Sequence, residues 1–271
     1  MNRNAALAGA LFFFAACLPG ASVRTIEEME VVLLPKPPFE ASGAAEKAGP
    51  FTFAQVSAKP NQITDVDAWF EKNGLELPVF EAGNLPSGIP ATYLGKPLVR
   101  AIHGSDSTLL LYGPDLSGGR FLIAMDGKTG AFKYGYDFAN FEGEGSMEQR
   151  LRWAVEKAGV LYVSHAHPGY AKDSGGRNAY LTALDVKTGK ILWRSRALVA
   201  NAGTFAVLDA GIVSGYGFTA EPDFLYLIDR KDGAVLTKAK LKSGPEQILV
   251  EDGRIYVRSY DTDYVFELRK K

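Results

Sequence analysis

The segment SHAHPGY places two histidines, His165 and His167, two positions apart. If the segment is extended, both side chains point to the same side, and two imidazoles so placed can bind zinc or copper. His103 and Asp173 are the candidates for further ligands. Two ligands do not complete a metal site, however, and the chain has only 3 histidines. The competing interpretation is a strand that ends in a loop, and the sequence predicts no metal site and no cofactor.

Three glutamates, Glu142, Glu144 and Glu148, lie close together in FEGEGSMEQR. Paired carboxylates can act as acid and base in a hydrolase, but spacing in the sequence does not reveal their distance in the fold. The same cluster fits a solvated loop between repeats. The glycines of GYGF and SGGR are typical of turns, because neither segment precedes a helix that would bind phosphate. We therefore predict no catalytic residue.

The N-terminal segment MNRNAALAGALFFFAACLPG has one cation, Arg3, followed by an apolar stretch over residues 5–16. This stretch is too short to span a bilayer and predicts a secretory signal peptide over residues 1–16. Its end, FAAC, resembles the bacterial lipobox, in which a cysteine is lipidated and becomes the mature N-terminus. The lipobox usually has leucine where Phe14 stands. The alternative is an ordinary cleaved signal with an incidental cysteine.

Cys17 is the only cysteine of the chain, so it has no partner for an intramolecular disulfide. Lipidation at Cys17 would attach several acyl chains, which is enough for stable membrane anchoring. In lipoproteins an aspartate after the cysteine often marks retention in the inner membrane. Leu18 stands there in this chain, and the resemblance therefore implies the outer membrane.

The overall composition favours a globular protein with many turns. Hydrophobic residues make up 46% of the chain, its net charge is −1, and it contains 29 glycines and 12 tyrosines. Such numbers support a real core made of strands and tight turns. A nearly neutral chain lacks the basic face that nucleic acid requires, so we expect no nucleic-acid partner.

The region before the repeats divides into two parts. Residues 17–50 are rich in proline, alanine and glycine and predict a flexible tether behind the lipid, although residues 31–34 could instead dock as a strand. Residues 51–97 form an N-terminal segment. It begins with the alternating stretch FTFAQVSA and continues with one short helix in TDVDAWFEKNG, which Thr64 would cap and Gly74 would end.

One hairpin pattern occurs three times after residue 98, in FLIAMDGKTGAF, LTALDVKTGKIL and LYLIDRKDGAVL. An aspartate at the start of the turn can accept hydrogen bonds from the next N–H groups, and glycine takes the positive φ that closes the hairpin. One carboxylate per turn is too few oxygens for calcium, so we expect a structural role. The turn residues are Asp126 and Gly130, Asp185 and Gly189, and Asp229 and Gly233.

Two further apolar strands precede each hairpin, at residues 98–103 and 108–112, 151–156 and 160–165, and 204–208 and 211–216. A fourth copy begins at residue 248 and contains three strands. Four strands that recur every 40 to 60 residues are typical of propeller blades. The missing strand could be residues 51–58, which would close a ring of about four blades. Alternatives are a divergent fifth blade within residues 60–97 and an open arc completed by a partner.

The segments YLTALDVKTGKILWR and FLYLIDRKDGAVL resemble the blade motif of PQQ-like β-propellers. Trp193 stands at the typical aromatic position, and Tyr134 is near its place in the first copy. The resemblance implies an all-β fold over residues 98–271, with one short helix before it. Dehydrogenases of this family need a larger ring, a calcium site and commonly a disulfide of neighbouring cysteines. This chain has no cysteine in its folded body, so the resemblance implies the non-enzymatic branch.

Together these features predict a cell-envelope lipoprotein, anchored in the outer membrane, that binds an envelope protein as a scaffold. The rival hypothesis is a propeller that binds a ligand or metal in its central funnel, or an enzyme that acts there.

Overall fold

The computed structural model describes residues 30–37, 46–61, 65–80, 85, 88–105, 107–115, 117–141 and 148–271. The predicted signal peptide, the lipidation site at Cys17, the cap at Thr64, and both Glu142 and Glu144 lie outside the described residues. Among the residues described, no helix has the length and apolar character needed to cross a bilayer.

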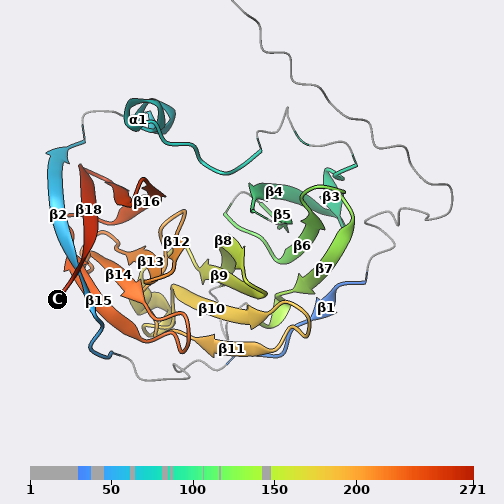
Figure 1. Cartoon of the computed structure of the whole chain (residues 1–271). Helices are drawn as coiled ribbons and strands as arrows, with labels where there is room; N and C mark the ends of the chain where they lie inside the picture. Colours follow the sequence, from blue (N-terminus) through green and yellow to red (C-terminus); the bar gives the residue numbers. More distant parts are fainter. Residues whose placement is uncertain are drawn as a thin grey trace, which may run out of the picture.

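The chain folds into a small all-β propeller of four sheets, or blades, which stand in chain order around a common centre (Figure 1). Blade 1 contains β4 (Lys96–His103), β5 (Ser107–Tyr112), β6 (Phe121–Asp126) and β7 (Phe132–Asp137). Blade 2 contains β8 (Arg150–Lys157), β9 (Val160–Ala166), β10 (Tyr180–Asp185) and β11 (Ile191–Arg194). Blade 3 contains β12 (Ala206–Leu208), β13 (Gly211–Tyr216), β14 (Phe224–Ile228) and β15 (Val235–Lys240). Blade 4 contains β16 (Pro245–Glu251), β17 (Arg254–Ser259), β18 (Thr262–Lys270) and β2 (Phe51–Pro60).

Inner strands of the blades are buried along their whole length because neighbouring blades cover both of their faces. Every residue of β5 and of β13 is buried, and their sequences, STLLLY and GIVSGY, are runs rather than alternating patterns. The edge strand β2 instead leaves Val56 48% exposed. The periodicity of each strand therefore reflects its place in the blade.

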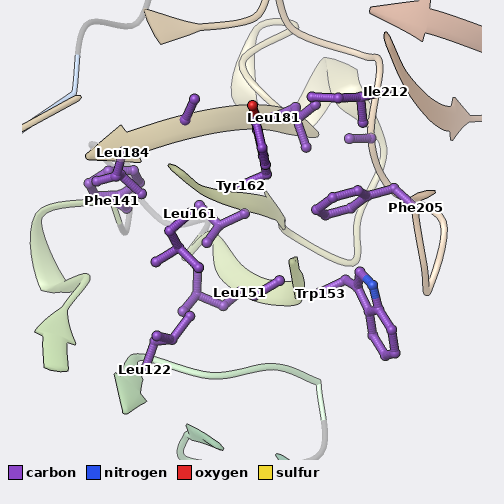
Figure 2. Packing of buried hydrophobic residues seen from close by; sticks show 14 of the residues in the cluster. Leu122, Phe141, Leu151, Trp153, Leu161, Tyr162, Leu181, Leu184, Phe205 and Ile212 are labelled. Carbon is purple, nitrogen blue, oxygen red and sulfur yellow. The ribbon is translucent and has the colours of Figure 1, made fainter. Parts of the chain in front are cut away.

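The main core joins blades 1, 2 and 3 in one continuous cluster of buried side chains. Figure 2 shows Leu122 of blade 1, Leu151 and Trp153 of blade 2, and Phe205 and Ile212 of the blade 3 region in this cluster. A second cluster joins blade 3 to blade 4. Side-chain packing therefore joins neighbouring blades, and hydrogen bonds between blades add to it, such as the reciprocal backbone pair between Gly119 and Leu151, both at 2.9 Å.

The fourth strand of blade 4 comes from the N-terminal side of the chain. β2 pairs antiparallel with β18 along its whole length, from Phe51 opposite Lys270 to Pro60 opposite Thr262. The segment FTFAQVSA, one of the candidates for the missing strand, therefore completes the blade within the same chain. Phe53 packs edge-on against Phe266, with 5.9 Å between the ring centroids.

Residues 65–80 connect the two ends of the propeller instead of forming part of a fifth blade. Helix α1 (Val66–Asn73) is capped by Asp65 and ends at Gly74, whose φ is 62°. Its Trp69 packs in a cluster with Leu249 and Tyr256 of blade 4. The chain then reaches blade 1, where the N–H of His103 donates to the Pro78 carbonyl at 2.7 Å. The cap is Asp65, where the sequence predicted Thr64, because the Asp65 carboxylate accepts from the Asp67 N–H at 2.9 Å.

Two parts of residues 17–50, expected to be a tether, lie against the propeller. β1 (Val32–Leu33) pairs parallel with β7, and Leu34 is fully buried. Farther along, Lys47 contacts Asp229 at 2.5 Å and Asp232 at 2.6 Å in the turn of blade 3. Docking of residues 31–34 was the alternative to the tether, and apolar burial explains it. A further short strand, β3 (Thr92–Tyr93), pairs with β4 at the other side of blade 1.

Candidate functional site

The three repeated turns share one geometry. The Asp126 carboxylate accepts from the Lys128 and Thr129 N–H groups at 3.1 and 2.8 Å, and the pKa of Asp126 is lowered because Thr129 donates to its charged form. Asp185 has the same bonds to residues 187 and 188, and Asp229 accepts from the Lys231 N–H at 2.8 Å. The φ angles of the turn glycines, Gly130, Gly189 and Gly233, are 67°, 67° and 75°. The three aspartates therefore stabilise the turns that join the outer strands.

An aromatic side chain connects each of the first two blades to the turn of the next. Tyr136 of blade 1 donates from its hydroxyl to the Val186 carbonyl at 2.8 Å, and Trp193 of blade 2 donates from Nε1 to the Arg230 carbonyl at 2.9 Å. The sequence pointed to Tyr134, whose pairing with Ala124 in blade 1 matches that of Trp193 in blade 2. Tyr134 also reaches blade 2, where its hydroxyl donates to Glu156 of β8 at 2.8 Å, whereas Tyr136, two residues on, makes the contact with the turn.

His165 lies at the end of β9 and has no solvent exposure. Its Nδ1 lies 3.2 Å from Gln149 Oε1, and its Nε2 lies 2.9 Å from Thr182 Oγ1. Its ring stacks on Tyr180 with 5.7 Å between the centroids. Burial, together with the charge of Arg194, lowers the pKa of His165 well below its usual value. Both ring nitrogens therefore have partners inside blade 2.

His167 is also buried, and it organises the loop that follows β9. Its Nε2 lies 2.7 Å from Ser174 Oγ, and its Nδ1 accepts from the Gly169 N–H at 3.2 Å. The Asn178 side chain accepts from the His167 N–H at 2.9 Å. Burial lowers the pKa of His167. His165 and His167 are therefore both accounted for by hydrogen bonds within blade 2 and its loop.

The other candidate ligands lie in different surroundings. His103 packs against Phe80 and lines a second cavity of about 290 Å³, together with Trp153 and Phe205. Asp173 is exposed, in a short 3-10 helix (Ala171–Ser174). Across the described ranges of the chain, no three histidine, cysteine or carboxylate side chains are grouped so that they could hold a metal ion. Glu148 forms an ion pair with Arg150 at 2.8 Å.

A cavity of about 790 Å³, which we call the central funnel, is lined by residues from all four blades. Its lining includes Arg100, Arg152, Asp223, Glu246, Gln247 and Tyr260. Tyr260 is 80% exposed, whereas both arginines are half-buried. The funnel therefore combines charged groups in its lining with an aromatic ring open to solvent.

Loops of blades 2 and 3 are cross-linked beside the funnel. The Glu221 carboxylate accepts from the Ala171 N–H at 2.8 Å and also from the Tyr216 hydroxyl. Tyr170 packs edge-on against Phe218, with 4.7 Å between the ring centroids. Burial and the hydrogen bond to Glu221 raise the pKa of Tyr216, so it stays a neutral donor. These contacts hold two loops from different blades in one arrangement.

Arg100 and Arg152 are the functional candidates that reasoning from the sequence missed. Burial lowers the pKa of both guanidinium groups, and the charge of Arg152 lowers the pKa of Arg100 further. The two side chains are far apart in the sequence, on the first strands of blades 1 and 2. The sequence feature that could have identified them is a cation within an otherwise apolar strand. An example is LRWAVE, where Arg152 separates Leu151 from Trp153.

Comparison with known proteins supports the repeat assignment. A family model described as "Outer membrane protein assembly factor BamB" matches residues 177–269, which include β10 and extend into β18 of blade 4. The chain carries PQQ-like β-propeller repeats. The structure adds a further blade with the same turn geometry, blade 1, before the matched range of this PQQ-like propeller.

Several solved structures resemble this PQQ-like propeller. BamB from Moraxella catarrhalis has 18% sequence identity and a TM-score of 0.40, with 77% of this chain and 59% of that chain covered. The computationally designed Ika4 protein has 15% identity and a TM-score of 0.38, with coverages of 68% and 98%. The quinohemoprotein alcohol dehydrogenase ADHIIG from Pseudomonas putida HK5 has 13% identity and a TM-score of 0.35, with coverages of 62% and 37%. No curated protein matches the sequence significantly.

Proposed function

We propose that this chain is a bacterial cell-envelope lipoprotein that acts as a protein-interaction scaffold. The observation that carries the proposal is the central funnel, a preformed cavity of about 790 Å³ beside loops tied together by Glu221. Rigid loops lose little conformational entropy when a partner binds, which favours recognition. The match to a family described as an outer membrane protein assembly factor supports a protein partner in the envelope.

The membrane part of the proposal rests on the sequence. The FAAC segment that ends in Cys17 favours lipidation, and Leu18 after it favours the outer membrane. A lipid anchor would raise the local concentration of the propeller near membrane-bound partners. Growth in the presence of a labelled fatty acid tests this part: wild type should incorporate label, and a Cys17→Ala variant should not. Label in neither protein would overturn the lipoprotein assignment.

Crosslinking in intact cells tests the scaffold. The tagged full-length protein is crosslinked, extracted in detergent and purified, and the proteins bound to it are identified by mass spectrometry. We expect a reproducible envelope protein, reduced at least about fivefold when Phe218 and Tyr260 at the funnel are both changed to alanine. An Asp209→Ala variant is the matched control, because Asp209 is exposed in a turn of blade 3 and does not line the funnel. Recovery of no protein above the untagged background would contradict the scaffold.

A further inference from the structure

We propose that Arg100 and Arg152 form a carboxylate-binding site in the central funnel, and that a peptide segment of the partner protein supplies the carboxylate. This inference rests on the proposed scaffold function and names the chemistry that the partner must present. Its basis is a pair of like charges that have no counter-ion among the described residues, in a cavity that also has apolar and hydrogen-bonding surface.

Within the part of the chain that the structure describes, the two guanidinium groups have few partners. Among the described residues, Arg100 donates from Nη1 to the Gly203 carbonyl at 3.3 Å and lies over the Trp153 ring at 5.4 Å. Arg152 donates from Nη1 to the Ser117 carbonyl at 3.3 Å. Within the same described ranges neither arginine forms an ion pair with a carboxylate. Each guanidinium has five N–H donors, so most donors of this pair remain available to a ligand.

Proximity of the two arginines has an electrostatic cost. Both groups are half-buried, and the charge of Arg152 disfavours the charged form of Arg100. A carboxylate between them would offset this repulsion and accept parallel hydrogen bonds from a guanidinium fork. A bound anion would therefore both reduce the repulsion between the two guanidinium groups and accept hydrogen bonds from them.

Irregular strand pairing brings these side chains to the funnel. The pairing of β8 with β9 shifts between Leu151 and Trp153, which leaves Arg152 as an extra residue in a bulge. In β4 the shift lies between Leu98 and Arg100. A corresponding shift in β16 leaves Glu246 as the extra residue. Bulges redirect side chains and often lie beside binding sites, and here three of them occur on first strands that line one cavity.

The rest of the funnel favours a peptide over a polyanion. The charged residues of the lining are the cations Arg100, Arg152 and Lys242 and the carboxylates Asp223 and Glu246. This excess of one cation suits a single carboxylate better than a phosphate-rich ligand such as a lipid headgroup or nucleic acid. Phe218 and Tyr260 provide aromatic surface, and the Gln247 amide can both donate and accept hydrogen bonds. A peptide has the matching set of groups: one carboxylate for the arginines, side chains for the rings, and backbone groups for the amide. An acidic side chain and a C-terminal carboxylate share this chemistry.

Nuclear magnetic resonance titration of the folded chain with four probes tests the inference. The probes are acetyl-Gly-Phe-Gly-Glu-amide, the same peptide with glutamine in place of glutamate, the glutamine peptide with a free C-terminal carboxylate, and inorganic phosphate. We expect at least one carboxylate peptide to bind about tenfold or more tightly than the neutral peptide, a factor equivalent to about 1.4 kcal/mol. The peptide that does so identifies the source of the carboxylate. Equal affinities for all three peptides, or tightest binding of phosphate, would overturn the inference.

Variants locate the binding to the arginine pair. Arg100→Gln and Arg152→Gln should each weaken the carboxylate peptide about tenfold and leave the neutral peptide unchanged. Arg254→Gln is the matched control, since Arg254 is exposed on β17 and lies outside the funnel. Arg100→Lys and Arg152→Lys keep the charge without the fork and should weaken binding by a smaller factor, which provides a second reading if a glutamine variant does not fold. Unchanged affinity in all four arginine variants would contradict the inference.

Repeating the cell crosslinking with Arg100→Gln/Arg152→Gln separates the two proposals. Loss of the partner in the double variant, with retention in Arg254→Gln, supports the carboxylate site. A partner retained by the double variant would leave the scaffold standing and refute the carboxylate site. Absence of a partner even with wild type would refute the scaffold and, with it, the peptide source of the carboxylate.

Discussion

The indole of Trp193 in blade 2 lies against Gly233 in the turn of blade 3. A Cβ atom added to Gly233 would lie only 2.5 Å from the Trp193 ring, and Trp193 Nε1 donates to the neighbouring Arg230 carbonyl at 2.9 Å. Tyr136 and Gly189 repeat the relationship between blades 1 and 2, with a Cβ distance of 2.8 Å. The glycine thus serves two purposes: it closes its own hairpin and leaves room for the aromatic ring of the preceding blade.

Gly233→Ala should therefore be more destabilising than the same change in an isolated turn. Gly130 has nearly the same φ, 67° against 75°, but nothing lies within 4 Å of the position a Cβ would occupy. We expect Gly130→Ala to lower the free energy of unfolding by about 1 kcal/mol, the cost of a left-handed alanine. Gly233→Ala should cost about 1–3 kcal/mol more, because the ring must move. Urea denaturation of both variants measures the difference, and equal losses would contradict the blade-to-blade role of Gly233.

The closing strand offers a matched pair of substitutions. Phe53 packs on Phe266 and the core between blades 3 and 4, whereas Val56 on the same strand is 48% exposed. Phe53→Ala should lower the free energy of unfolding by about 2–3 kcal/mol, and Val56→Ala by less than about 0.5 kcal/mol. Chemical denaturation distinguishes the two. A small effect of Phe53→Ala would mean that β2 contributes little to the closed blade.

A second pair of substitutions tests whether residues 30–37 are docked on the propeller in solution. Leu34 is fully buried, and its N–H donates to the Asp137 carbonyl at 3.0 Å, whereas Val32 is 54% exposed. Leu34→Ala should weaken the docking of this segment by about 2–4 kcal/mol of free energy. The released segment should be cleaved faster by a protease near residue 34. Val32→Ala should leave the proteolysis rate close to that of wild type. If Leu34→Ala is cleaved no faster than wild type, residues 30–37 behave as part of a tether in solution.

Protonation of His165 should make the propeller less stable in mild acid. The pKa of His165 is lowered in the folded state by burial, so the unfolded chain binds the additional proton below its ordinary pKa of about 6.5. The contribution to stability is complete above that pH and is lost as the pH falls, by up to about 1.4 kcal/mol per pH unit. His167 has the same direction of shift and adds to the effect.

Urea unfolding of wild type and His165→Gln at pH 5, 6, 7 and 8 measures this dependence. The variant should have lower stability at every pH, because Gln149 and Thr182 lose their ring partners, but its loss between pH 7 and 5 should be smaller than that of wild type. The difference between the two proteins should stay constant between pH 7 and 8, where the imidazole is neutral in both states. Parallel pH profiles over the whole range would contradict a neutral His165 in the folded state.

Local patterns were enough to predict most strands. The turns at Asp126, Asp185 and Asp229 depend on residues only a few positions apart, so their hydrogen bonds are determined by nearby sequence. The helix before the repeats was predicted with its end at Gly74, and its cap was displaced by one residue, to Asp65. The cap shifts easily, since neighbouring threonine and aspartate side chains are both good caps.

The sequence by itself determined the repeat, its turns and the all-β propeller, because the period of apolar residues and the turn chemistry are both local. Only the tertiary structure decided that Tyr136 rather than Tyr134 reaches the turn of the next blade, and that the segment around Leu34 docks. Only the tertiary structure brought Arg100 and Arg152 to one funnel. These features join residues that are distant in the chain, and their meeting depends on how whole blades pack and on where the strands bulge, which no local pattern encodes.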